Sequence, residues 1–191
     1  MLENKYIIVA GINGAGKSTL YQLQPKLFSG TKRINADEIL RDFGGNWKSA
    51  ADNIKAMKKE VQLLHEALQN KISIHVETTL AGTGKSQLRL IDEAHKNGFN
   101  VTLLYVTLNS ADKAIDRVSQ RVEKGGHGIP SDLIKKRYMQ SNHNLLEVAL
   151  KSDNVYVYDN SDKFKKVYMR EGNKIFKNEL VDYPWIDNKI S

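Results

Sequence analysis

Short apolar runs alternate with longer periodic segments along the whole chain. Residues 5–10 and 100–106 are nearly continuous apolar runs, which is typical of strands buried on both faces. Residues 71–79 alternate between apolar and polar and are rich in β-branched side chains. The pattern predicts strands at 5–10, 33–35, 71–79, 100–106 and 154–160.

Between these runs, apolar residues recur at helical spacing. One stripe steps by three and four and consists of Ile54, Met57, Val61, Leu64 and Leu68. A coiled coil has similar spacing, but this stripe lasts barely two heptads, so we expect the helix to pack against a sheet. Further helices are predicted after residue 19, over 87–97, from the capping residue Ser110, and from Ser131 to about 150.

Strands that alternate with helices predict an α/β fold. The expected architecture is a three-layer sandwich around a mostly parallel five-stranded sheet, of the P-loop kinase type. A chain of 191 residues suits one domain, 1–191. We also expect a mobile Gly-rich lid at about 121–137 and a C-terminal hairpin at about 163–178.

Residues 11–19 fit the phosphate-loop pattern G-x-x-x-x-G-K-[ST], between a predicted strand and a predicted helix. Backbone N–H groups of such a loop surround phosphates, and the helix N-terminus adds partial positive charge. The alternative is a Gly-rich turn without a ligand. The motif predicts ATP, with GTP as the other candidate, and Mg²⁺. The expected nucleotide contacts are Gly11, Asn13, Gly14, Ala15, Gly16, Lys17, Ser18 and Thr19, with the Ser18 hydroxyl as a magnesium ligand.

A second glycine-rich segment, residues 82–86, looks like another phosphate loop. Thr79 stands where the first glycine of that pattern belongs. We therefore expect a turn that leads into the helix at 87–97.

Two carboxylates are expected beside the phosphate loop, because ligands bind at the carboxyl ends of parallel strands. Asp37 follows the second strand and is a candidate general base for an acceptor hydroxyl, although it is equally suited to cap a helix at 38–43. Glu77 ends the third strand and is a candidate contact for an acceptor hydroxyl or metal-bound water; a solvated strand end is the alternative. Asn160 follows the last strand at the same edge.

Three arginines, Arg117, Arg121 and Arg137, bracket the Gly-rich segment 125–130. Closure of this segment would bring an arginine onto the γ-phosphate and exclude water. At least one of the three is expected to be an ordinary surface arginine. His127 is a candidate phosphate contact or lid contact, and the lack of a His or Cys partner at ligand spacing argues against a metal role.

The formal charge of +7 and the absence of cysteine refine this picture. Basic residues are scattered rather than blocked, which disfavours direct nucleic-acid binding. The N-terminus runs straight into the first strand, and no apolar run is long enough to cross a bilayer. We expect a cytoplasmic protein without a membrane segment.

Residues 5–161 resemble zeta toxin-like proteins. The segments that carry the resemblance are Gly11–Thr19, 35–37, 77–80, 117–121, 125–130 with Arg137 and Tyr138, and 158–161. The element Gly-Gly-His-x-Ile-Pro is far more specific than the phosphate loop. The resemblance implies a kinase that uses ATP and Mg²⁺ to phosphorylate the 3′-hydroxyl of UDP-N-acetylglucosamine, with an antitoxin as partner.

The resemblance also implies site roles. Lys17 and Ser18 would contact phosphate and Mg²⁺, and Asp37 would be the base. Glu77 and Thr79 would contact the acceptor sugar, and Arg121 and Arg137 would stabilise the transferring phosphate, with Arg117 as the alternative to Arg121.

The chain departs from the well-known toxins because it is shorter and lacks insertions that help to hold the UDP-sugar. The acceptor therefore stays open. The alternatives are a P-loop kinase for a nucleoside, an antibiotic or a polynucleotide 5′-hydroxyl, and a nucleotide-dependent switch or ATPase.

Overall fold

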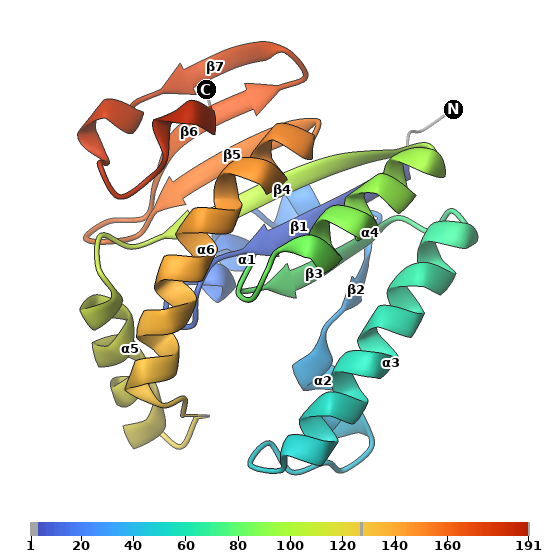
Figure 1. Cartoon of the computed structure of the whole chain (residues 1–191), viewed down its shortest axis with the longest axis vertical. Coiled ribbons are helices and arrows are strands. Elements are labelled where there is room, and N and C mark those ends of the chain that lie inside the picture. Colours follow the sequence, from blue (N-terminus) through green and yellow to red (C-terminus); the bar gives the residue numbers. More distant parts are fainter. Residues whose placement is uncertain (1–3, 127, 191) are drawn as a thin grey trace.

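A seven-stranded sheet forms the centre of the computed structural model, which describes residues 4–126 and 128–190 (Figure 1). The strand order is β2-β3-β1-β4-β5-β6-β7. The first five strands of this order are parallel, and β6 and β7 are antiparallel. The strands are β1 (Asn4–Ala10), β2 (Lys32–Ile34), β3 (Ile74–Thr78), β4 (Phe99–Thr107), β5 (Asn154–Asp159), β6 (Lys165–Glu171) and β7 (Lys174–Asn178).

Helices cover both faces of the sheet, because side chains of a strand alternate between its faces. Along β1, Tyr6 and Ile8 join a core formed with α3, α4 and α6, whereas Ile7 and Val9 join a core formed with α1 and α5. The α-helices are α1 (Lys17–Leu23), α2 (Ala36–Asp42), α3 (Ala50–Gln69), α4 (Lys85–Lys96), α5 (Ala111–Glu123) and α6 (Ser131–Lys151). Short 3₁₀ turns occupy Pro25–Phe28, Leu180–Asp182 and Asn188–Ile190.

The α/β class and the parallel five-strand core are confirmed, but the prediction of a five-stranded sheet is wrong. The sheet has seven strands, because β6 pairs antiparallel with β5 and β7 then pairs with β6. The predicted hairpin therefore extends the sheet at one edge. Within the described residues, no helix has the length and apolar content that crossing a bilayer requires.

The predicted packing of the α3 stripe is correct for only half of the helix. Leu64 and Leu68 are buried, whereas Ile54, Met57 and Val61 are 54%, 59% and 43% exposed. The N-terminal half of α3 extends past the sheet and lies beside α2 (Figure 1). Helical spacing identifies an apolar face, but it does not tell where the neighbouring layer ends.

Candidate active site

The phosphate loop follows β1 at the carboxyl edge of the sheet, where its backbone requires glycine. Gly11, Gly14 and Gly16 have φ of 140°, 82° and 101°. A Cβ on Gly11 would lie 2.3 Å from the carbonyl oxygen of Val106, so an alanine there would collide with β4. The Gly11 amide donates to the Thr78 carbonyl oxygen (3.1 Å), which ties the loop to β3.

Asn160 and Arg117 brace the other side of the loop. Asn160 Nδ2 donates to the Ala15 carbonyl oxygen (2.8 Å), and Arg117 Nη2 donates to the Asn160 carbonyl oxygen (2.8 Å). Arg117 Nη1 also lies 3.5 Å from the carbonyl oxygen of Gly14. Both side chains therefore support the loop. Nucleotide contact by Asn160 and substrate contact by Arg117 remain predictions.

Lys17 folds back over the loop that precedes it. Its Nζ donates to the carbonyl oxygens of Gly11 (2.7 Å) and Ile12 (3.4 Å). Burial lowers the pKa of Lys17 to about 8, and the nearby charge of Arg121 also lowers it, while Glu77 and Asp37 oppose the shift. Glu77 and Asp37 offset the burial of this ammonium group only in part. A bound phosphate would supply further negative charge and so favour the charged form of Lys17.

Nucleotide binding should therefore depend on pH above about 8, since bound phosphates favour the charged form of Lys17. We expect the ATP dissociation constant, measured by calorimetry, to rise about tenfold per pH unit from there. A Lys17→Arg variant should bind without this dependence, because its guanidinium stays charged. A flat wild-type profile from pH 8 to 10 would contradict this role of Lys17.

Asp37 lies in the first turn of α2, and its side chain is exposed. The helix cap is Asn35, whose Oδ1 accepts from the amides of Asp37 (2.9 Å) and Glu38 (3.1 Å). The capping alternative for Asp37 is therefore wrong. Its charge acts on the pKa values of Lys17 and Arg137, so the carboxylate lies within electrostatic range of both cations.

Glu77 is held by an arginine that the sequence patterns did not single out. Arg33 Nη2 donates to Glu77 Oε1 (2.5 Å), and Arg33 Nη1 lies 3.0 Å from Glu38 Oε1. This pair fixes the direction of the Glu77 carboxylate at the end of β3. Thr79 follows two residues later, and its hydroxyl oxygen is 3.4 Å from the Ala81 amide. Acceptor contact by Glu77 and Thr79 remains a prediction.

Arg137 reaches the phosphate loop from α6. Its Nη1 donates to Asn13 Oδ1 (2.8 Å). Burial lowers the pKa of Arg137, and the charge of Asp37 opposes that shift. Arg121, in the last turn of α5, is exposed and lies near enough to lower the pKa of Lys17. His127 lies outside the described residues, so its predicted contact and the motion of the lid remain predictions.

The second glycine-rich segment forms the predicted turn at residues 82–84 and leads into α4, which begins at Lys85 rather than at residue 87. Asn144 of α6 donates to the carbonyl oxygens of Leu80 (2.7 Å) and Gly82 (3.1 Å). These bonds support Leu80 in a left-handed conformation, with φ of 51°. A Cβ on Gly84 would lie 3.0 Å from the Asn144 side chain, so the amide fills the space beside this turn.

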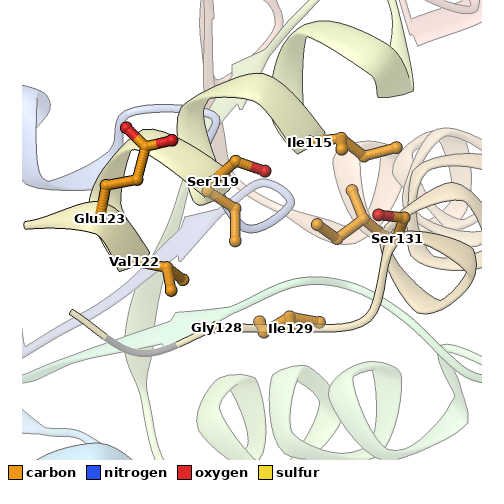
Figure 2. A pocket seen from close by; sticks show the side chains of 9 residues that line it. Ile115, Ser119, Val122, Glu123, Gly128, Ile129 and Ser131 are labelled. Atoms are coloured by element: carbon orange, nitrogen blue, oxygen red, sulfur yellow. The ribbon is translucent and has the colours of Figure 1, made fainter. Parts of the chain in front are cut away.

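A pocket of about 290 Å³ lies between α5 and the chain that enters α6 (Figure 2). Ile115, Ser119 and Val122 line it from α5, opposite Gly128, Ile129 and Ser131. At 100° per residue, this flank of α5 faces away from the flank that carries Arg117 and Arg121. The pocket is therefore separate from the phosphate loop.

The sequence patterns did not identify three further residues at the carboxyl edge of the sheet, namely Arg33, Glu60 and Asn144. Glu60 accepts from the Ala36 amide (3.0 Å), which is the first of α2. Glu60 and Asn144 each stand on a face that their helix otherwise buries with apolar residues, such as Ala56 and Leu145. For Glu60 and Asn144, a polar residue at a core-facing position was the sequence signal that could have identified them. Arg33 carried no such signal.

The parallel sheet, the phosphate loop at its carboxyl edge and the cations around that loop define the class, a P-loop phosphotransferase of the kinase type. The family model described as Zeta toxin matches residues 2–178. The chain belongs to the Zeta toxin family.

Known proteins include relatives in sequence and others that share this fold. An uncharacterized protein of Haemophilus influenzae is 34% identical over 138 residues, which are 72% of this chain and 95% of that protein. A structure from the PezAT chromosomal toxin-antitoxin system of Streptococcus pneumoniae has a TM-score of 0.62 and 18% identity, over 88% of this chain and 72% of that one. AvrRxo1-ORF1:-ORF2 with ATP has a TM-score of 0.71 and 14% identity, over 96% of this chain and 63% of that one.

Proposed function

We propose that this protein transfers the γ-phosphate of ATP to a hydroxyl group of a small acceptor, with a nucleotide-sugar such as UDP-N-acetylglucosamine as the favoured acceptor. One observation carries the proposal: Arg137 of α6 donates to Asn13 of the phosphate loop (2.8 Å), and Asp37 of α2 lies near enough for its charge to act on Arg137. Phosphoryl transfer needs such a cation near the transferring group and such a base near the acceptor.

One set of side chains would bind the phosphates of ATP, and another would bind the acceptor. Lys17 and Arg137 would neutralise charge on the phosphates, and Ser18, exposed at the start of α1, would ligate Mg²⁺. A magnesium ion held there would supply further neutralisation of the phosphate charge. Asp37 would accept the proton of the acceptor hydroxyl, and Glu77 and Thr79 would orient the acceptor.

The acceptor can be tested with a panel assayed for ATP consumption and for phosphorylated product. We expect turnover with UDP-N-acetylglucosamine to exceed turnover with a nucleoside, an aminoglycoside antibiotic or an oligonucleotide 5′-hydroxyl. Preference for the oligonucleotide, with affinity that falls steeply with salt, would favour the polynucleotide alternative that the net charge of +7 suggests. ATP hydrolysis indifferent to every acceptor would favour a switch or ATPase.

We also propose a cytoplasmic location and an antitoxin protein as partner. Family membership supports the partner, as does the toxin-antitoxin origin of the PezAT structure. The test is growth after induced expression. We expect arrest with the wild type and growth with Asp37→Asn; equal growth of both would contradict a toxic kinase activity.

A further inference from the structure

The first backbone amides of α2, the helix that carries Asp37, are bonded by two side chains. Asn35 at the end of β2 accepts from the amides of Asp37 and Glu38. Glu60 of α3, 24 residues further along the chain, accepts from the remaining amide, that of Ala36, at 3.0 Å. The first three N–H groups of the helix are thus all bonded within the protein.

We propose that Glu60 is a positioning residue, which fixes the first turn of α2 through the Ala36 amide and so directs the Asp37 carboxylate toward the acceptor. This inference rests on the proposed function for the role of Asp37. Glu60 would act through the Ala36 amide and not by contact with the phosphate loop or the reacting atoms.

The short length of α2 makes such an attachment necessary. A helix of seven residues has little stability of its own and depends on the contacts that hold it. Asn35 ties α2 to β2, which has only three residues and lies at the edge of the sheet. Glu60 ties it to the 20-residue α3, whose Leu64 and Leu68 are buried in the core. Removal of Glu60 would leave Asn35 as the bonding partner of the first-turn amides, beside the ion pair of Arg33 with Glu38.

Glu60 occupies a position where burial disfavours the charged form of a carboxylate. It occupies the face of α3 that also carries the buried residues Ala56, Leu64 and Ala67. Burial raises its pKa to about 7; the Ala36 hydrogen bond lowers it, and the charges of Asp37 on α2 and Glu77 on β3 raise it further. Burial raises the pKa of Tyr6 on β1, and the charge of Glu60 adds to that rise. The charged form accepts the stronger hydrogen bond, so the attachment of α2 should strengthen as pH rises through 7.

Two substitutions separate the hydrogen bond from the charge. Glu60→Gln keeps an oxygen that can accept from Ala36, whereas Glu60→Ala removes it. In the full chain without ligands, we expect amide hydrogen exchange of residues 36–38 to be at least about tenfold faster in the Ala variant and close to wild type in the Gln variant. Glu66→Ala is the matched control, because Glu66 lies on the exposed face of α3. This substitution should change neither the hydrogen exchange of residues 36–38 nor kcat.

Activity gives the second readout, with ATP and UDP-N-acetylglucosamine as probes. A misdirected base should lower kcat of Glu60→Ala on the order of 10²-fold, with the acceptor KM unchanged. Glu60→Gln should retain most of kcat. If the Ala variant does not fold, the protection of the Ala36 amide decides: it should rise through pH 7 in the wild type and stay level in Glu60→Gln.

Three results would overturn the inference. If residues 36–38 exchange at the wild-type rate in a folded Ala variant, Glu60 does not hold the first turn of α2. A raised acceptor KM with unchanged exchange would make Glu60 an acceptor contact instead. Faster exchange in the Ala variant, together with a wild type that phosphorylates no hydroxyl, would keep the attachment but refute the proposed function and the catalytic part of the inference.

Discussion

Replacement of Asp37 by Asn is expected to lower kcat about 10²–10⁴-fold, because an amide cannot take the proton of the acceptor hydroxyl. The side chain keeps its size, and the cap of α2 is Asn35, so the helix should remain intact. ATP affinity should stay close to wild type, since Lys17 and the loop supply the phosphate contacts. Steady-state kinetics with UDP-N-acetylglucosamine and calorimetry with ATP measure the two quantities.

Asp42→Asn is the matched control, because Asp42 is exposed at the other end of the same helix. It makes the same change of charge and should retain wild-type kcat. Equal kcat for Asp37→Asn and Asp42→Asn would show that Asp37 is not the base.

Replacement of Arg137 by Gln should lower kcat by about 10³-fold, the effect expected when a phosphoryl transfer loses an arginine from its transition state. Arg137 lies against Asn13 of the phosphate loop, and burial already lowers its pKa, so the site holds the guanidinium at a cost. ATP affinity should change far less than kcat, because the charge that Arg137 stabilises is greatest in the transition state.

Lys136→Gln provides the comparison for Arg137, since Lys136 is the exposed neighbour on α6. It should leave kcat unchanged. A loss confined to ATP affinity in Arg137→Gln, with kcat intact, would make Arg137 a ground-state nucleotide contact and contradict its role in the transfer step.

The nucleotide half of the site was accessible from the sequence because its signal is local. Glycines, lysine and serine stand at fixed offsets between a strand and a helix, and the structure has β1 and α1 at those places. The order of strands and helices also predicted the fold class. The hairpin at about 163–178 was also predicted, but its place in the sheet was not, because no local spacing indicates that β6 pairs with β5.

The acceptor half depends on contacts that no spacing encodes. Whether Asp37 or Asn35 caps α2 is decided by which side chain turns back toward the helix, and both residues are good caps. Arg33 meets Glu77 across 44 residues of chain. Glu60 reaches α2 only because α3 runs beside it. These residues act through tertiary packing, which the sequence pattern leaves undetermined.

The fate of the γ-phosphate distinguishes phosphoryl transfer to a hydroxyl from hydrolysis of ATP. ATP labelled at the γ-phosphate should be incubated with the protein, Mg²⁺ and UDP-N-acetylglucosamine, and the label should be followed to its product. We expect one label in the acceptor for each ATP consumed, and almost none with Asp37→Asn. Label released only as inorganic phosphate, with every acceptor in the panel, would contradict transfer to a hydroxyl.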